Sequence, residues 1–192
     1  MRTRVHPIEI ESYAILRTRL DTTDLPRLTR AVVERVVHAT ADTGWAGDLI
    51  CAEDALLAGR AALLSGAPLV ADVRMVTAGI TAIPATAALD LAPRDPPMGM
   101  SRSAAGIRAA VARYPVGAVW VIGNAPTALA ELVRSTVQTP LVVGLPVGFV
   151  GAVAAKAALR AARLPAVSNR SERGGAAAAA AVVNALLYAE PE

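Results

Sequence analysis

Short apolar runs alternate with helical segments from residue 69 onward, and this alternation constrains the fold more than any other feature. The runs are residues 69–73, 118–122, 141–143 and 165–167, with residues 85–91 as a further candidate. Strands that are apolar along their whole length are typical of a parallel sheet that is buried on both faces. Strands that alternate with helices indicate crossover connections between parallel neighbours. We therefore predict an α/β fold with a mainly parallel central sheet and helices on both faces.

The helical segments between these runs have their own start and stop signals. One helix is expected over residues 102–114, another begins at Pro126, and a third follows a glycine loop and ends near Arg163. The last helix covers residues 175–188 and begins with a run of alanine, which favours helix over linker. Residues 90–99 carry three prolines and are expected to form a loop.

The chain before residue 65 predicts a helical N-terminal segment. A first helix is expected to open at His6 and Pro7, because proline is favoured at the start of a helix. Asp24 is expected to cap a second helix that has Pro26 in its first turn. One face of that helix is apolar: Leu25, Leu28, Val32 and Val36. A further helix is expected over Ala55–Leu64.

Composition limits the class of protein and its partners. We expect residues 1–192 to form one domain, and a hydrophobic content of 54% excludes a disordered chain. The basic residues are all arginine except Lys156, and they are interleaved with acids. No basic stripe with aromatic partners occurs, so no nucleic-acid partner is expected. The planar fork of arginine suits carboxylate or phosphate ligands. The alternative is that these arginines reflect only the codon bias of a GC-rich genome.

The sequence also predicts where the protein resides. A single cysteine, Cys51, excludes an internal disulfide. The first 20 residues carry several acids and arginines, so no signal-peptide core is expected there. The longest apolar run, residues 141–155, is interrupted by Pro146 and by glycines, whereas a membrane-spanning helix needs about 20 residues. We expect a cytoplasmic protein with no membrane contact.

Three predicted strands end in loops that suit a ligand. The loops are residues 123–127, 144–151 and 169–175. Asn124 is expected to cap the helix that follows it, and Arg170 and Arg173 add positive charge to the third loop. Ligands of open parallel sheets sit at the carboxyl ends of the strands, where helix N-termini favour anions. The alternative is that glycine, asparagine and proline only make turns here. Neither glycine pattern of nucleotide-binding loops is present, so a nucleotide site is not supported.

His38 is the candidate proton donor among the few residues suited to chemistry. Glu34 precedes it by four residues and Asp42 follows it by four, so a continuous helix would place all three on one face. Acids beside an imidazole favour its protonated form and fix its tautomer. The alternative is a cation that satisfies the end of a helix. The two histidines and Cys51 lack metal-ligand spacing, so no metal is expected.

Ser101, Arg102 and Ser103 open the helix after the proline loop. Either serine is suited to cap the helix, and Arg102 is suited to hold a carboxylate. No serine–histidine–aspartate order stands out along the chain.

Together these segments resemble the precorrin-8X methylmutase family of cobalamin biosynthesis. The matching strings run in the family's order across nearly the whole chain: His6-Pro7-Ile8-Glu9, Val37-His38-Ala39, Asp72-Val73-Arg74-Met75-Val76 with Ala78-Gly79-Ile80, Arg102-Ser103-Ala104-Ala105, Gly123-Asn124-Ala125-Pro126-Thr127-Ala128-Leu129 and Gly144-Leu145-Pro146-Val147-Gly148-Phe149-Val150-Gly151-Ala152. Each string is modest alone, and the set is specific.

The resemblance implies an isomerase. It implies that a methyl group moves from carbon 11 to carbon 12 of precorrin-8X, giving hydrogenobyrinic acid or its cobalt counterpart, without a cofactor. It places the active-site histidine at His38, which would protonate or hydrogen-bond a macrocycle nitrogen. It also implies a homodimer with the tetrapyrrole near the subunit interface. The substrate's carboxylates would then be held by Arg102, Ser103, Asn124, Thr127, Gly148 and Arg170.

The chain departs from the family pattern at several polar positions. Ala154 and Ala155 stand where the family usually has glutamate and serine, and Ala176 stands where it usually has serine. The segment before Ser101 is shortened as well. These changes remove polar groups near the predicted crevice, so the resemblance alone assigns no role to Lys156. They leave open a second interpretation, a non-catalytic corrinoid binder or carrier of the same fold.

Overall fold

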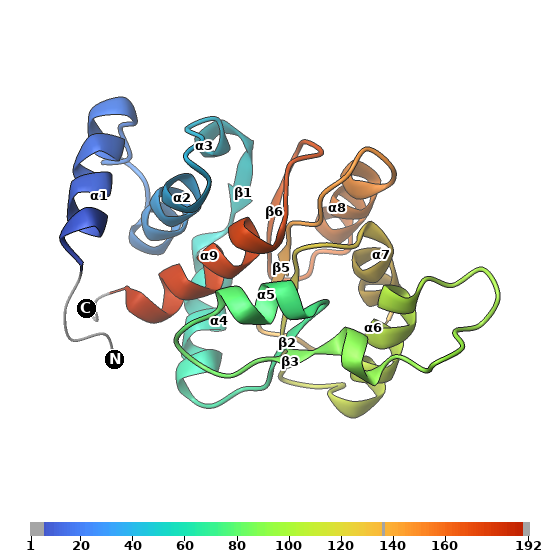
Figure 1. Ribbon diagram of the computed structural model, residues 1–192. Coiled ribbons are helices and arrows are strands. Elements are labelled where there is room, and N and C mark those ends of the chain that lie inside the picture. The colour runs from blue at the N-terminus through green and yellow to red at the C-terminus, as the bar shows by residue number, and fades with distance from the viewer. Residues whose placement is uncertain (1–5, 136, 190–192) are drawn as a thin grey trace.

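The structure is a computed structural model that describes residues 6–135 and 137–189. Within this part of the chain six strands form one sheet, which Figure 1 shows nearly edge-on. The strands are β1 (Leu49–Cys51), β2 (Leu69–Ala71), β3 (Thr86–Ala87), β4 (Val119–Ile122), β5 (Val142–Gly144) and β6 (Ala166–Asn169). Their order is β1-β6-β5-β4-β2-β3, with β1 antiparallel to β6 and the other pairs parallel. The predicted mainly parallel sheet is confirmed.

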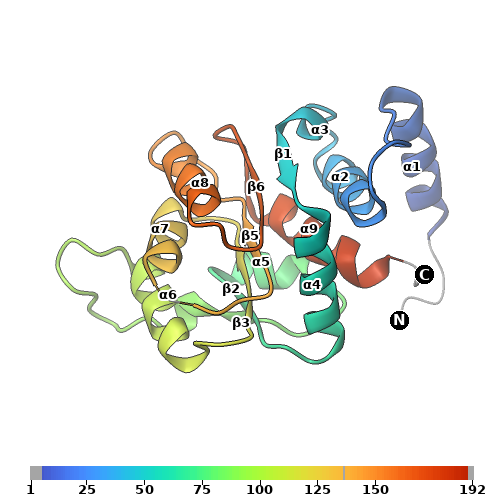
Figure 2. The same cartoon turned by 180° about the vertical axis from the view of Figure 1, so that it is seen from behind.

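Helices cover both faces of this sheet, as predicted. They are α1 (Pro7–Arg19), α2 (Arg27–Thr40), α3 (Trp45–Asp48), α4 (Glu53–Leu64), α5 (Arg74–Gly79), the 3₁₀ helix η1 (Ala88–Leu91), α6 (Arg102–Arg113), α7 (Pro126–Arg134), α8 (Ala152–Ala161) and α9 (Ala176–Tyr188). Figure 1 shows α6, α7 and α8 to the right of the strands and α2 and α9 to their left, and Figure 2 shows the same layers from behind.

The alternation of side chains along β4 divides the core between these layers. Val119 and Val121 pack in the cluster that includes α2 and α9, whereas Trp120 and Ile122 pack in the cluster that includes α6, α7 and α8. Successive side chains of a strand point to opposite faces, so one fully buried strand serves both layers. All four residues are completely buried, as the apolar run 118–122 predicts.

The predicted helical N-terminal segment is present and forms an outer layer. α2 packs against α9, and α1 packs on α2 on the side away from the sheet (Figure 1). α1 buries only Leu16, while Ile8, Ile10 and Ile15 are exposed. α1 is therefore held to α2 largely through polar side chains.

The predicted start of α2 is wrong by two residues. Pro26, not Asp24, precedes the helix, and Leu25 lies outside it and is 37% exposed. The first helical amides are instead satisfied from α4, because the Glu53 carboxylate accepts the Leu28 and Thr29 amides at 2.8 Å each. A distant carboxylate thus supplies the cap that local spacing assigned to Asp24.

The predicted strand at residues 85–91 is mostly a 3₁₀ turn. Only Thr86 and Ala87 pair with β2, and η1 follows at once. α6 packs so closely on this turn that a Cβ at Gly106 would lie 2.5 Å from the Ala88 carbonyl oxygen. Three short elements were not predicted at all: α3, β1 and α5.

The connection from β2 to β4 determines where the loops that follow the strands lie close together. The chain leaves β2 for β3 on one side and then returns to place β4 on the other side of β2. The order β3-β2-β4-β5-β6 therefore has a topological switch point between β2 and β4. The carboxyl ends of β2, β4, β5 and β6 all lie at the same edge of the sheet, because these strands are parallel.

Candidate active site

At the switch point, a carboxylate of the protein itself occupies the N-terminus of α7. Asp72, directly after β2, accepts the amides of Gly123 at 3.1 Å, Asn124 at 2.9 Å and Ala125 at 2.9 Å. The helix begins after Ala125 without a side-chain cap, so the predicted capping role of Asn124 is wrong. Burial raises the pKa of Asp72, and the three amide bonds oppose that rise. Asp72 thus satisfies the amides that lead into α7, and the Asn124 side chain is released from capping.

The three loops predicted to bind a ligand are joined by backbone hydrogen bonds into one surface. Val147 donates its amide to the Asn124 carbonyl at 3.4 Å, and Gly148 donates to the Glu172 carbonyl at 3.2 Å. Gly175 donates to the Leu145 carbonyl at 2.9 Å. We call this surface, residues 123–127, 144–151 and 170–175, the strand-end rim.

The glycines of the middle loop allow a path that other residues disfavour. Gly148 has φ of 140° and Gly151 has φ of 82°, both in the left-handed region that favours glycine. Between them, Phe149 is 96% exposed and Val150 is 89% exposed. The loop therefore presents bare backbone and two large apolar side chains.

The N-termini of α6 and α7 meet beside the rim. Ser101 caps α6 by accepting the Ala104 amide at 3.2 Å, and its hydroxyl lies 2.7 Å from that of Thr127. Of the two serines suited to cap α6, Ser101 does so, and Ser103 lies half-buried in the first turn. Arg102 is exposed, and its side chain makes no hydrogen bond or ion pair within the described residues. The structure thus brings Thr127 close to the start of α6 and leaves the Arg102 guanidinium available.

Arg170 and Arg173 are both already engaged with neighbouring backbone or acid. The Arg170 guanidinium donates to the Gly47 carbonyl at 3.2 Å, and Arg173 forms an ion pair with Asp42 at 3.0 Å. Both side chains remain solvent-exposed. The third loop is therefore tied to the segment that follows α2.

His38 lies on α2 and is held by α1. Its Nδ1 atom is 2.8 Å from the Ser12 hydroxyl, and its ring stacks on Tyr13 with centroids 5.0 Å apart and planes 11° apart. Arg35, one turn earlier, pairs with Glu9 and donates to the Tyr13 hydroxyl at 3.4 Å. We call these five residues the His38 cluster.

The prediction that Glu34 and Asp42 lie beside His38 is wrong. Glu34 turns away to Arg17 at 2.7 Å and Arg30 at 3.0 Å. Asp42 lies beyond the helix, because Ala41 adopts a left-handed φ of 52° and ends α2. Burial lowers the pKa of His38, the Arg35 charge lowers it further, and Glu9 opposes both. The imidazole is therefore mainly neutral at pH 7, not a cation fixed by acids.

The His38 cluster and the strand-end rim occupy separate parts of one chain. Figure 1 places α1 and α2 at one end of the molecule and α6 at the other. Within residues 6–135 and 137–189, no hydrogen bond or ion pair joins His38 to any of the six predicted anchors. The third loop is linked to the segment that follows α2, through the Asp42–Arg173 ion pair and the bond from Arg170 to Gly47.

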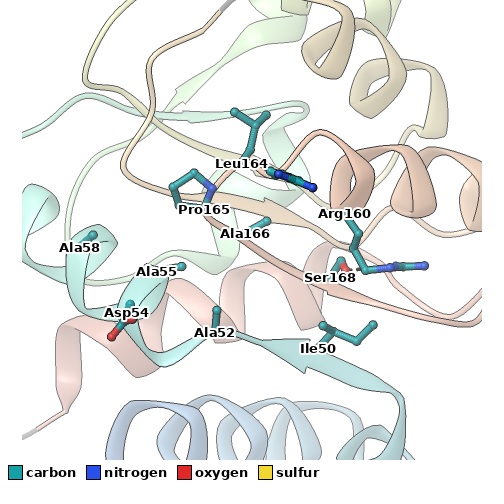
Figure 3. Close-up of a pocket in the computed structure, with 11 residues that line it drawn as sticks. Ile50, Ala52, Asp54, Ala55, Ala58, Arg160, Leu164, Pro165, Ala166 and Ser168 are labelled. Atoms are coloured by element: carbon teal, nitrogen blue, oxygen red, sulfur yellow. Dashed lines mark hydrogen bonds between the residues drawn. The ribbon is translucent and has the colours of Figure 1, made fainter.

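Two hollows of the chain lie at the opposite edge of the sheet. One of about 510 Å³ adjoins the start of β6 and is lined by residues that include Arg160, Pro165 and Ala166 (Figure 3). Another of about 500 Å³ adjoins the start of β2. Neither contains a predicted site residue. The strand-end rim is therefore distinct from both of these cavities.

Other groups suited to chemistry are few. Burial raises the pKa of Cys51 to about 12, so its thiol is not a ready nucleophile. Across the described ranges, no three His, Cys, Asp or Glu residues come together as metal ligands. No helix in that part of the chain is long and apolar enough to cross a bilayer.

Sequence reasoning missed residues whose partners are distant along the chain. Asp72 accepts hydrogen bonds from amides more than 50 residues away in the sequence. Ser12 and Tyr13 lie on α1 and contact His38 on α2. The only signal for Asp72 was its place in one of the family strings. Ser12 carried no signal, because a lone serine in a helix is common.

Comparison with known proteins identifies the family. The sequence pattern of the precorrin-8X methylmutase family matches residues 7–189. The cobalt-precorrin-8 methylmutase of a Synechocystis species is 35% identical, covering 95% of this chain and 94% of its own. That of Salmonella typhimurium is 37% identical, covering 94% and 93%. The precorrin-8X methylmutase of Pseudomonas aeruginosa is 38% identical, covering 92% and 91%.

A solved structure agrees with these sequence relatives. The precorrin-8X methylmutase of Thermus thermophilus superposes with a TM-score of 0.83 at 30% identity, covering 94% of this chain and 93% of its own. The matched region includes both the His38 cluster and the strand-end rim. The chain therefore belongs to the precorrin-8X methylmutase family, isomerases of cobalamin biosynthesis that move a methyl group within one molecule.

Proposed function

We propose that this protein moves the methyl group of precorrin-8X from carbon 11 to carbon 12, with His38 as the catalytic residue. One bond to the methyl carbon breaks and another forms within the same molecule, so no external methyl donor is required. The observation that carries the proposal is the fixed imidazole of His38, held by Ser12 and stacked on Tyr13 in a chain of this family.

His38 acts as a hydrogen-bond donor to a macrocycle nitrogen. When the Ser12 hydroxyl donates to Nδ1, the neutral ring carries its proton on Nε2. The lowered pKa favours this neutral form at pH 7. Nε2 makes no hydrogen bond to the described residues, so its N–H is available to a ligand. Of the two roles that the resemblance implies, hydrogen bonding therefore fits better than full protonation.

The strand-end rim and the start of α6 hold the carboxylate arms of the substrate. Arg102 supplies an unpaired guanidinium, and Ser103 and Thr127 supply hydroxyls near it. Asn124 contributes its side-chain carboxamide, which does not cap α7 because Asp72 accepts the backbone amides there. Gly148 allows close approach of the backbone, and Arg170 lies at the far side of the rim.

The working form is a homodimer whose site combines the His38 cluster of one protomer with the rim of the other. Ile8 is 69% exposed and Ile10 60% exposed on α1, and Phe149 is 96% exposed on the rim. Burial of such side chains favours association, at roughly 25 cal/mol per Å² of apolar surface. α2, which carries His38, and α6, which carries Arg102 and Ser103, lie at opposite ends of the molecule (Figure 1), and this separation supports a site completed by the second copy. We further propose that each chain acts as one domain and works in the cytoplasm.

A carrier function is the second candidate. Ala154 and Ala155 of α8 place no polar side chain at the two positions where glutamate and serine were expected, and Ala155 is buried among apolar neighbours. A binder that keeps the rim but has lost turnover would show this pattern. Retention of His38 favours the enzyme.

One assay separates the two functions. Purified protein is incubated with precorrin-8X, and the absorbance spectrum is followed over a single turnover. We expect conversion to the spectrum of hydrogenobyrinic acid. A protein that binds hydrogenobyrinic acid but leaves precorrin-8X unchanged is a carrier, and Ala154→Glu with Ala155→Ser is then the variant to test for recovered turnover.

A further inference from the structure

Lys156, the chain's single lysine, is fully buried in α8 and binds a loop. Its ammonium donates to the Ser171 carbonyl at 2.8 Å and also to the Arg173 carbonyl. Buried lysines usually pair with a carboxylate, because an unpaired charge in the interior is costly. Here both partners are backbone oxygens, so the charge is used to hold a segment of chain.

Asp48, at the end of α3, holds the same loop through its amides. Its carboxylate accepts the Arg170 and Ser171 amides at 2.9 Å each and the Ser171 hydroxyl at 2.5 Å. Asn169 links the two sides, since its amide nitrogen donates to Asp48 at 2.8 Å and to the Arg173 carbonyl at 3.0 Å. Lys156 thus donates to carbonyls of the loop, while Asp48 accepts from its amides.

The held loop touches both halves of the proposed site. It accepts the Gly148 amide through the Glu172 carbonyl, and Arg173 forms the ion pair with Asp42 after α2. Its fit is tight, because a Cβ at Gly174 would lie 2.3 Å from the Leu145 carbonyl oxygen. A shift of this loop would therefore move the glycine loop and release the end of the helix that carries His38.

We propose that Lys156 is a positioning residue, which fixes the loop of residues 170–175 through two backbone carbonyls and thereby shapes the rim for the substrate's carboxylates. This inference rests on the proposed function. Burial lowers the pKa of Lys156 to about 8 against the opposing pull of Asp48, so the group is still mostly an ammonium at pH 7. An ammonium with three donors suits two carbonyl oxygens at once.

The test is Lys156→Met, which replaces the apolar stem of the side chain with one of similar length and removes its donors. The matched control is Arg60→Met, because Arg60 also donates to two carbonyls, those of Leu186 and Ala189 at the far end of α9. Hydrogen–deuterium exchange reports on the loop without any ligand. Titration with hydrogenobyrinic acid and single-turnover conversion of precorrin-8X then report on the site.

We expect the amides of Arg170, Ser171 and Gly175 to exchange about tenfold faster in Lys156→Met, with β4 unchanged. The Kd for hydrogenobyrinic acid should rise about tenfold, while conversion at saturating substrate stays within about threefold. Arg60→Met should change neither the loop nor the affinity. A purely structural role would lower stability without this division between affinity and rate.

Unchanged exchange in the loop overturns the inference, and so does faster exchange with unchanged affinity. If wild-type protein fails to bind hydrogenobyrinic acid, the proposed function fails, and the exchange result still decides whether Lys156 holds the loop. Should Lys156→Met not fold, Asp48→Asn weakens the hold on the same loop from its amide side. The same faster exchange and weaker binding are then expected, and their absence contradicts the proposal.

Discussion

The His38 cluster and the strand-end rim are organised by different means. The cluster consists of side chains from two helices, with each group fixed by another side chain, as Ser12 and Tyr13 fix His38. The rim consists mainly of backbone, and its loops are joined by hydrogen bonds such as that from Gly148 to Glu172. The carboxylates of Asp72 and Asp48 accept hydrogen bonds from backbone amides of these loops.

This difference separates the two tasks of the proposed enzyme. A single imidazole fixed by neighbours suits a chemical step that needs one well-placed N–H. A rigid surface with several anchors suits a substrate with several carboxylates, because its binding energy is spread over many contacts. Loss of one group should therefore abolish chemistry in the cluster but only weaken binding in the rim.

The largest effect is expected for His38→Ala. Loss of one preorganised hydrogen-bond donor costs about 10²–10³-fold in rate, so methyl migration should fall by about that factor. Binding of hydrogenobyrinic acid and the fold should remain largely intact. Single-turnover conversion beside a binding titration measures both, and His6→Asn, which keeps a capping residue at the start of α1, is the matched control. Conversion at the wild-type rate would remove His38 from the mechanism.

Asp72→Ala should damage the rim through stability rather than chemistry. Three amides, one buried and two partly buried, lose their acceptor, and each unsatisfied buried donor costs about 1–3 kcal/mol. We expect the free energy of unfolding to fall by about 3–5 kcal/mol, because these losses are not fully additive. Urea denaturation measures this value, and Asp72→Asn should lie between wild type and alanine. A loss below about 1 kcal/mol would show that other groups satisfy the switch point.

Acid should weaken the attachment of α1 to α2, through Glu34. Burial raises the pKa of this carboxyl, but hydrogen bonds from Arg17, Thr22 and Arg30 outweigh it and hold the pKa at about 2, below the ordinary 4.5. The stabilisation is therefore complete above pH 4.5 and is lost as the pH falls from 4.5 through 2, with a total of about 3 kcal/mol. Urea denaturation between pH 6 and 3 should show this decline. Glu34→Gln should flatten it, and an equal decline in that variant would assign the effect to other groups.

Arg102→Ala should weaken binding without slowing the bound reaction. A charge-assisted contact of about 1.5–3 kcal/mol corresponds to roughly a 10- to 100-fold rise in Kd. Because this contact is made equally in the ground and transition states, conversion at saturating substrate should not change. Arg113→Ala removes the same charge from the far end of α6 and is the control. Unchanged affinity with a collapsed rate would mean that Arg102 has a different role.

The sequence predicted the regions built from local signals and missed those built from distant contacts. The apolar runs of β2, β4, β5 and β6 were recognisable, because fully buried strands are uniformly apolar. β1 was not, since its three residues are defined only by pairing with β6 at the sheet edge. The position of His38 was expected, but its charge was not, because Ala41 ends the helix before Asp42. The carboxylates at the start of α2 and α7 come from Glu53 and Asp72, which no local pattern links to those helices.

A mixture of two variants, one impaired in chemistry and one in binding, tests most directly whether the cluster and the rim meet across a dimer. His38→Ala and Arg102→Ala proteins are unfolded together, refolded as a mixture, and assayed for conversion of precorrin-8X below saturation. If His38 of one protomer serves the rim of the other, each mixed dimer holds one intact site, and activity should return to about a quarter of the wild-type rate. If activity stays at the mean of the two separate variants while mixed dimers form, both residues act within one chain, and the proposed shared site is wrong.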